Sequence, residues 1–117
     1  MSLKNCFWTS AVMLCTFSTL MPISVLAQRK HPAEEIGIRS VNGNLSTSIK
    51  FVNNRQQTVK VQWLDYRGKR KFYKTLSPGE QYDQQTYLTH PWLITDTNNN
   101  SLYLFFPDAQ PRTIEIQ

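Results

Sequence analysis

The sequence predicts an all-β fold, a sandwich or barrel of short strands, on three observations. Apolar and polar residues alternate in several short segments, most cleanly in TVKVQWLDY (58–66), where Val59, Val61 and Trp63 share one face. Turn signals separate such segments about every ten residues. Finally, no window keeps a helical period over three turns.

Turns delimit the first expected strands. The segment IGIRSV (36–41) is a strand candidate that ends at an Asn-Gly pair, which is a strong turn signal. The segment STSIKFVNN (46–54) alternates and predicts a strand with one apolar face. Downstream, the pair Arg67-Gly68 turns the chain into another strand candidate, KRKFYKTL (69–76).

The remaining expected strands follow the Ser-Pro-Gly turn at 77–79, where proline presets φ and glycine accepts a positive φ. EQYDQQTYL (80–88) is a polar strand candidate, and HPWLIT (90–95) comes after it. After a polar loop, the nearly continuous apolar run SLYLFFP (101–107) predicts a strand buried on both faces. RTIEIQ (112–117) alternates and predicts the last strand.

The N-terminal segment has the layout of a secretory signal peptide. Lys4 precedes an uncharged, mostly apolar stretch that ends at Val25-Leu26-Ala27, a cleavage pattern. We expect residues 1–27 to be cleaved, leaving a flexible lead-in at 28–35 and one domain at 36–117. The protein is then secreted or periplasmic. The alternative is a retained membrane anchor, which the many hydroxyl residues in the apolar run disfavour.

The charge of the chain limits its partners. The formal net charge is +5. In an exported protein this excess indicates solvated faces or anionic surface partners and argues against nucleic acid. Five cations lie within eight residues at RGKRKFYK (67–74). We interpret this basic run as a solvated turn, with anionic polysaccharide or lipid headgroups as the alternative ligand.

The residues predict no enzyme, no metal site and no cofactor site. The cysteines, Cys6 and Cys15, lie in the expected signal peptide, and His31 lies in the lead-in. The aspartates are scattered around turns, and there is neither a Gly-rich phosphate loop nor a GxSxG motif. We therefore expect a non-enzymatic protein, and an enzyme built on His90 is only the third hypothesis.

Residues suited to binding gather at YDQQTYLTHPW (82–92). Thr86 and His90 are an even number of residues apart, so a regular strand points both to one face and Tyr87 to the other. The proline after His90 keeps that residue extended. Three aromatic candidates complete the set: Trp63, Tyr73 and Trp92. Each residue also has a structural interpretation, as core or as a satisfied histidine, and the pattern alone leaves both open.

A series of motifs carries a family resemblance: RSVN (39–42), IKFVNN (49–54), WLDYRG (63–68), YKTLSPG (73–79), TYLTHPWL (86–93) and, after a shorter loop, LFFPDAQP (104–111). Together they resemble the β domain of the von Hippel–Lindau family. The resemblance extends over nearly all of the chain after residue 27. The combination is much more specific than any one of its motifs.

The resemblance implies a small antiparallel β-sandwich of seven or eight strands, with a groove that binds a hydroxyproline-containing peptide. The family positions that contact the peptide match six residues: Asn42, Trp63, Tyr73, Thr86, His90 and Trp92. The aromatics surround the proline ring, Thr86 (a serine in the family) and His90 contact its hydroxyl, and Asn42 holds the peptide. Such a site would separate hydroxyproline from proline by about two to four powers of ten.

Two departures from the family change the expected partners. The chain ends after its last expected strand, without the helical domain that binds elongin C, so we expect no link to a ubiquitin ligase. Lys69-Arg70-Lys71 replaces a less charged turn, so the groove edge should select a different peptide. The leading hypothesis is an exported, peptide-binding module. The alternative is a structural or interaction domain of the cell envelope or extracellular matrix, with the aromatics as core.

Overall fold

The computed structural model of the chain describes residues 28–43 and 45–117. The expected signal peptide at 1–27 lies outside the described residues. Across 28–43 and 45–117, no helix has the length and apolar character needed to cross a membrane.

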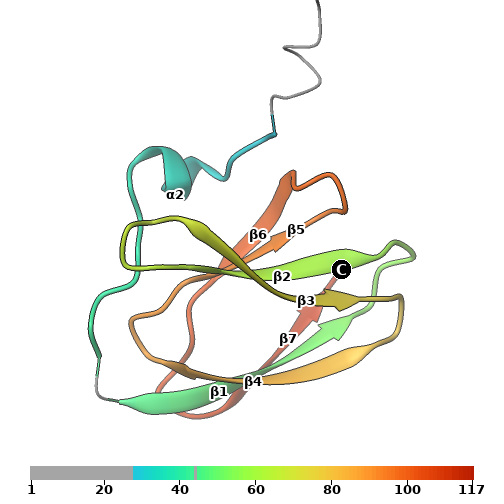
Figure 1. Cartoon of the computed structure of the whole chain (residues 1–117). Helices are drawn as coiled ribbons and strands as arrows, with labels where there is room; N and C mark the ends of the chain where they lie inside the picture. The colour runs from blue at the N-terminus through green and yellow to red at the C-terminus, as the bar shows by residue number, and fades with distance from the viewer. Residues whose placement is uncertain (1–27, 44) are drawn as a thin grey trace, which may run out of the picture.

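Seven strands form two sheets that pack face to face (Figure 1). The strands are β1 (Ser46–Asn53), β2 (Val59–Leu64), β3 (Arg70–Leu76), β4 (Gln81–Tyr87), β5 (Trp92–Thr95), β6 (Ser101–Phe105) and β7 (Arg112–Ile116). One sheet has the order β4-β1-β7, and the other has the order β3-β2-β5-β6. The predicted all-β sandwich is confirmed. One pair is not antiparallel: β7 runs parallel to β1, because the chain reaches β7 by crossing over from the other sheet.

The core lies between the two sheets, and the alternation of each strand selects its residues. On β1, Ile49 and Phe51 are fully buried, as are Val59 and Val61 on β2. The buried cluster consists of Ile49, Phe51, Val59, Val61, Leu76, Trp92, Ile94, Ile114 and Ile116. Each large apolar side chain contributes about 1.5–3 kcal/mol on burial. Since residues 28–117 contain no cysteine, this packing holds the domain without disulfides.

The segment 36–41 is not a strand, and the prediction there was wrong. A short helix, α2 (Pro32–Glu35), precedes it, and Gly37 turns the chain out of the helix at a φ of 87°. Ile36 is 86% exposed. The backbone then attaches to the end of β2, where Ser40 N donates to the carbonyl of Asp65 at 3.0 Å. The segment after the helix therefore runs beside the end of β2 without joining either sheet as a strand.

Strand β6 is not buried on both faces, which corrects a second prediction. It lies at the edge of its sheet, with β5 as its neighbour. Tyr103 is 37% exposed, and Phe106, just past the strand, is 40% exposed. A continuous apolar run is typical of a central strand, but the sheet order decides the position, and the order places β6 outermost.

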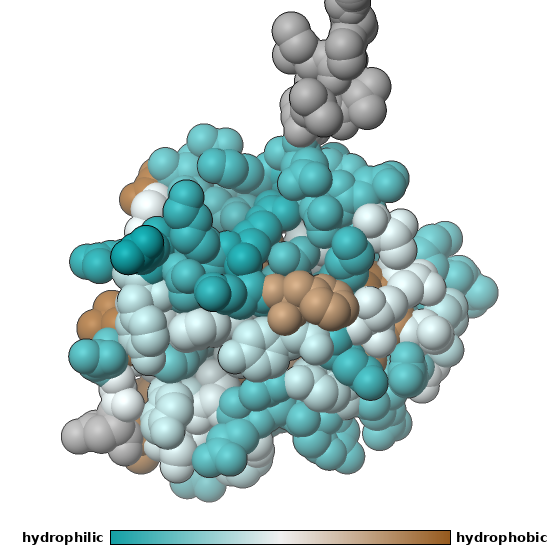
Figure 2. Space-filling model, in the orientation of Figure 1, coloured by the Kyte–Doolittle hydropathy of each residue, from teal (hydrophilic) through white to brown (hydrophobic). Residues whose placement is uncertain are grey.

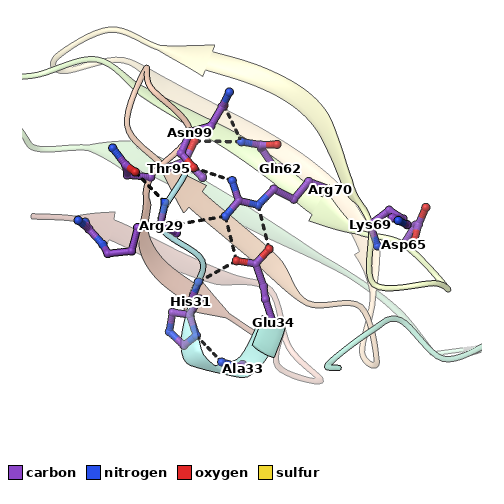
Figure 3. A network of polar contacts seen from close by, with 11 residues as sticks. Arg29, His31, Ala33, Glu34, Gln62, Asp65, Lys69, Arg70, Thr95 and Asn99 are labelled. Atoms are coloured by element: carbon purple, nitrogen blue, oxygen red, sulfur yellow. Dashed lines mark hydrogen bonds and ion pairs between the residues drawn. The ribbon is translucent and has the colours of Figure 1, made fainter. Parts of the chain in front are cut away.

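The lead-in has defined contacts, shown in Figure 3. His31 Nδ1 accepts a hydrogen bond from Ala33 N, and Glu34 accepts one from His31 N, so the two residues form a capping box on α2. Arg70 of β3 donates to both carboxylate oxygens of Glu34, at 2.8 and 2.9 Å. Arg29 N of the lead-in donates to Asn100 Oδ1 at 2.8 Å. The segment that the sequence predicts to be flexible therefore attaches to β3 and to the loop before β6.

Candidate functional site

A small pocket opens where the edges of the two sheets meet. Strand β3 is the edge of the four-stranded sheet, β4 is the edge of the three-stranded sheet, and the turn at 77–80 joins them. The pocket has a volume of about 140 Å³. We call it the ring pocket, and it is lined by Trp63, Tyr73, Gln84, Gln85, Thr86, Tyr87, His90 and Trp92. Five of the six predicted site residues therefore converge, and Asn42 is the exception.

Aromatic rings form the walls of the ring pocket. Tyr73 meets Trp92 edge to face with ring centroids 4.9 Å apart, and Trp63 meets Tyr73 edge to face at 6.3 Å. Trp63 also lies 5.3 Å from the ring of His90. Trp92 is only 2% exposed and packs on Phe51 of the core at 6.0 Å. Trp92 therefore serves the core and the pocket at once, whereas Tyr73, at 42% exposed, forms the rim.

A β-bulge sets the position of Tyr73. The register of β2 and β3 shifts between Val61 and Gln62, so that Val61 faces Lys74 while Gln62 faces Phe72. Tyr73 is the extra residue at this shift. Bulges bend an edge strand and re-aim a side chain, and they recur beside functional sites. Here the bulge accompanies the turn of Tyr73 toward Trp92.

Thr86 lies at the bottom of the ring pocket and is 3% exposed. Its Oγ1 accepts a hydrogen bond of 2.9 Å from Trp92 Nε1. A threonine hydroxyl also carries one donor of its own, and that donor remains for another acceptor. Across the β1–β4 pair, Thr86 faces Thr47, whose own Oγ1 is buried without a protein partner among the described residues. The two threonines thus share one inward face but differ in how their hydroxyls are satisfied.

His90 is 6% exposed and holds a neutral imidazole at pH 7. Burial lowers the pKa of His90 below its ordinary value, although the nearby Val41 carbonyl acts in the opposite direction. Its Nε2 lies 3.3 Å from Tyr66 Oη, within hydrogen-bond reach. A neutral imidazole offers one donor and one acceptor, so it can serve a ligand hydroxyl in either role.

A turn, not strand alternation, brings His90 into the ring pocket. Strand β4 ends at Tyr87, and His90 N donates to the Tyr87 carbonyl at 3.0 Å across the turn. The prediction that Tyr87 points away was therefore wrong: its ring lies 5.3 Å from the His90 ring, and it lines the pocket. Thr86 and His90 do meet at the pocket, but the even spacing that predicted this applies only to a continuous strand.

Tyr66 is a neighbour of the site that sequence reasoning missed. It follows β2 in the loop after Asp65, it is 45% exposed, and its ring meets Trp63 edge to face at 5.5 Å. Its hydroxyl bonds His90, as described above. A tyrosine in a turn gives no period-2 signal, so only the tertiary arrangement reveals it.

Asn42 stays outside the ring pocket. It is exposed in the irregular segment before β1 and is not among the residues that line the pocket. The same segment does reach the turn beside His90, because Thr89 Oγ1 donates to the Val41 carbonyl at 2.6 Å. Gly43 fits closely there, since a Cβ on it would lie 2.6 Å from Thr89 Oγ1. The role predicted for Asn42 stays a prediction.

The ring pocket combines aromatic side chains with a threonine hydroxyl and an imidazole. Within 28–43 and 45–117, no group of three or more His, Cys, Asp or Glu side chains is placed to hold a metal ion. The side chain that His90 bonds is the Tyr66 phenol rather than a carboxylate. The pocket presents four aromatic side chains, the hydroxyl of Thr86 and the imidazole of His90.

Comparison with known families decides the relationship. A family model described as "VHL beta domain" matches residues 38–111, which is more than half of the chain. The chain belongs to the VHL β-domain family. VHL β domains are non-enzymatic binding domains that act as protein-interaction modules, and the ring pocket of this VHL β domain lies within the matched residues.

Two individual proteins show similarity to this VHL β domain. The chain is 27% identical to "Protein Vhl" of Drosophila melanogaster over 71 residues, which are 61% of this chain and 39% of that protein. The chain thus spans well under half of the length of this relative. It also resembles the protein elicitor MoHrip2 from Magnaporthe oryzae, at 24% identity over 44% of this chain and 40% of that one. The TM-score of that match is 0.37.

Proposed function

We propose that this VHL β domain binds a proline-containing segment of a partner protein, with the proline ring in the ring pocket. The observation that carries the proposal is the convergence of Trp63, Tyr73, Thr86, His90 and Trp92 on one opening of about 140 Å³. A cavity of about 150 Å³ in another protein accommodates benzene, so this volume suits a single ring. Proline is rigid, so its binding loses little conformational entropy.

Hydroxylation of the proline is the finer part of the proposal. A ring hydroxyl at the bottom of the pocket would accept from the Thr86 hydroxyl or bond the neutral imidazole of His90. However, Thr86 Oγ1 already accepts from Trp92 Nε1, and His90 Nε2 already lies within reach of Tyr66 Oη. An unmodified proline therefore leaves few buried groups unpaired. We expect a gain of about 0.5–1.5 kcal/mol for one net hydrogen bond, roughly two- to tenfold in affinity.

We also propose that the domain works outside the cytosol. The support is the signal-peptide layout of residues 1–27. Expression of the full chain in its host, followed by mass determination of the exported product, tests this proposal. A product that begins at Gln28 is expected, and a cytosolic product that keeps residues 1–27 would overturn it.

The second candidate is a structural or interaction domain in which the aromatics are only core. The burial of Trp92 and its hydrogen bond to Thr86 favour that role for these two residues. It does not account for Tyr73, which is 42% exposed at a bulge and still turned toward Trp92. An exposed aromatic rim is the feature that separates a pocket from a core.

Titration with peptides that differ only in one residue tests the proposal. Tryptophan fluorescence is followed while a proline peptide, its 4-hydroxyproline form and its alanine form are added. Saturable responses to the first two, with hydroxyproline tighter, are expected. Equal affinities for the proline and hydroxyproline peptides would show that the site does not recognise the hydroxyl. An equal affinity for the alanine peptide would show that the ring pocket is not the binding site.

A matched pair of variants shows whether the response comes from the pocket. Tyr73→Ala removes an exposed tyrosine from the rim, and Tyr103→Ala removes a similarly exposed tyrosine from the edge strand β6. We expect Tyr73→Ala to weaken peptide binding at least tenfold, while Tyr103→Ala leaves it unchanged. If the two variants behave alike, the aromatic rim has no binding role.

A further inference from the structure

A second hollow adjoins the ring pocket, and its lining is strongly basic. It is broad and open, with a volume of about 710 Å³. Its lining residues are Trp63, Asp65, Tyr66, Arg67, Lys69, Arg70 and Lys71, and we call it the basic hollow. In Figure 2 the most hydrophilic surface of the visible face lies near where Figure 1 places the β2–β3 turn. The basic run of the sequence therefore forms one side of a concave surface.

Three of the four cations in the basic hollow are available to a ligand. Arg70 is committed to Glu34 through the paired hydrogen bonds shown in Figure 3. Among residues 28–43 and 45–117, no ion pair or side-chain hydrogen bond engages Arg67, Lys69 or Lys71. Such unpaired cations create a positive potential that attracts carboxylates.

One carboxylate, Asp65, also lines the basic hollow, and it already accepts hydrogen bonds from backbone N–H groups. Its Oδ1 accepts from Arg67 N and from Lys69 N, both at 2.8 Å. These backbone hydrogen bonds, led by that from Lys69, hold the pKa of Asp65 below its ordinary value, and the charges of Lys71 and Arg67 add to the effect. Asp65 thus organises the turn and offsets only one of the three available cations.

The turn that carries these cations is preorganised. Asp65 N donates to the Lys69 carbonyl at 2.8 Å, and Gly68 N donates back to the Asp65 carbonyl at 2.9 Å. Gly68 has a φ of 77°, and a Cβ on it would lie 3.0 Å from the Ile38 carbonyl oxygen, so glycine lets the turn pack against the preceding segment. A rigid turn loses little entropy when a ligand binds.

The basic hollow and the ring pocket adjoin each other at one shared aromatic wall. Trp63 lines both of them. Tyr66 lines the basic hollow, and its hydroxyl reaches His90 of the ring pocket at 3.3 Å. A peptide whose ring lies against Trp63 has one route out of the ring pocket past Tyr66 and another in the opposite direction, along β4. The first route carries it onto Lys69 and Lys71.

We infer that the basic hollow binds the side-chain carboxylates of acidic residues next to the proline that the ring pocket holds. The inference rests on the proposed function and specifies its substrate class, an acidic proline-containing segment of a protein. An extended peptide is favoured over a polysaccharide, because the hollow shares its aromatic wall with a pocket of single-ring size. Rim charges of this kind act chiefly on the association rate and on specificity.

The test uses four synthetic peptides of equal length with the purified protein. The peptides combine proline or alanine at the centre with glutamate or glutamine at the two following and two preceding positions. Affinities are measured by fluorescence anisotropy at low and at physiological salt. The glutamate peptide with proline should bind at least fivefold more tightly than the glutamine peptide with proline at low salt, and the difference should shrink as salt rises.

Variants locate the charge effect. Lys71→Gln and Lys69→Gln should each lower the affinity for the acidic proline peptide about two- to fivefold. The affinity for the glutamine peptide should not change. Lys50→Gln is the matched control, because Lys50 is an exposed strand lysine on the outer face of the other sheet. Equal losses for Lys50→Gln and Lys71→Gln would overturn the assignment to the hollow.

The other outcomes separate this inference from the proposed function. If proline peptides bind regardless of their flanks, the ring pocket stands and the inference fails. If acidic peptides bind equally with proline or alanine, the hollow is an independent anion site and the joint site is wrong. If none of the peptides bind but a sulfated polysaccharide binds in a Lys71-dependent manner, the proposed function and the inference both fail.

Discussion

Trp92 Nε1 donates a hydrogen bond of 2.9 Å to Thr86 Oγ1, and this contact links the largest buried side chain of the core to the bottom of the ring pocket. The two residues belong to different sheets, since Trp92 begins β5 and Thr86 lies in β4. The contact therefore has a structural and a functional consequence, and both can be measured.

Thr86→Val should destabilise the protein by about 1–3 kcal/mol, because the valine leaves the buried indole N–H of Trp92 without an acceptor. Thr86→Ser keeps the hydroxyl, so the free energy of unfolding should fall by less, about 1 kcal/mol for the missing methyl group. Urea unfolding followed by circular dichroism gives both values. Thr47→Val is the matched control: Thr47 faces Thr86, but its hydroxyl has no protein partner among the described residues, so we expect a neutral or stabilising effect. Equal losses at Thr47 and Thr86 would contradict the role of the hydrogen bond.

Tyr66→Phe should sharpen the preference for hydroxyproline over proline. The change removes the phenol that bonds His90 Nε2 and leaves that nitrogen for a ligand hydroxyl. Because Tyr66 is 45% exposed, the free energy of unfolding should change by less than about 0.5 kcal/mol. The measurement is the ratio of the two peptide affinities, expected to rise by about two- to tenfold. Tyr87→Phe serves as the control, and an unchanged ratio in Tyr66→Phe would show that His90 does not read the hydroxyl.

Stability should fall as the pH drops below about 6.5. The folded state holds the pKa of His90 below its unfolded value, so the unfolded chain binds a proton first. Stability is then complete above the unfolded pKa and is lost as the pH falls toward the folded pKa. The slope for one proton is at most about 1.4 kcal/mol per pH unit. Urea midpoints between pH 5 and pH 8 report it, and His90→Gln should flatten the curve over that range. A wild-type curve that stays flat there would contradict a buried neutral His90.

Glu34→Gln should cost about 1–2 kcal/mol of stability. Glu34 and Arg70 are largely buried, with side chains 6% and 17% exposed, and the change removes the charge that Arg70 contacts through two hydrogen bonds. Burial alone would raise the pKa of Glu34, but the Arg70 and His31 hydrogen bonds outweigh burial and lower it. The stabilisation is therefore present above about pH 4.5 and is lost below it. Glu35→Gln, at an exposed neighbouring position, should have almost no effect. Equal effects of the two changes would mean that the ion pair contributes nothing.

Much of the sandwich was predictable because alternation reports which face of a strand is buried. Ile49 and Phe51, Val59 and Val61, and Ile114 and Ile116 all alternate in sequence and are buried in the structure. The position of a strand within its sheet is not encoded in this way. The apolar run at Ser101–Phe105 has the composition of a central strand, yet it pairs only along one edge among the described strands.

The site was predictable where the family resemblance named its residues, and not where a turn decides the geometry. Tyr87 comes next to His90 because β4 ends and a turn follows, which local alternation cannot report. Tyr66 contributes through a loop. Tyr73 was named by the resemblance, but the bulge that sets its position was not predicted. These three tyrosines depend on backbone irregularities whose signals lie in tertiary pairing rather than in residue spacing.

The ring pocket straddles the seam between the two sheets, since β3 and β4 are the adjoining edges. A bound ring would contact Tyr73 on one sheet edge and Thr86 on the other. The ligand would therefore hold the two sheets together, and its site exists only in the folded protein. Binding to the folded state alone raises the unfolding free energy by about 2.7 kcal/mol when the ligand is present at one hundred times its Kd. The natural ligand should therefore raise the melting temperature of the protein, so candidate ligands can be screened by thermal denaturation.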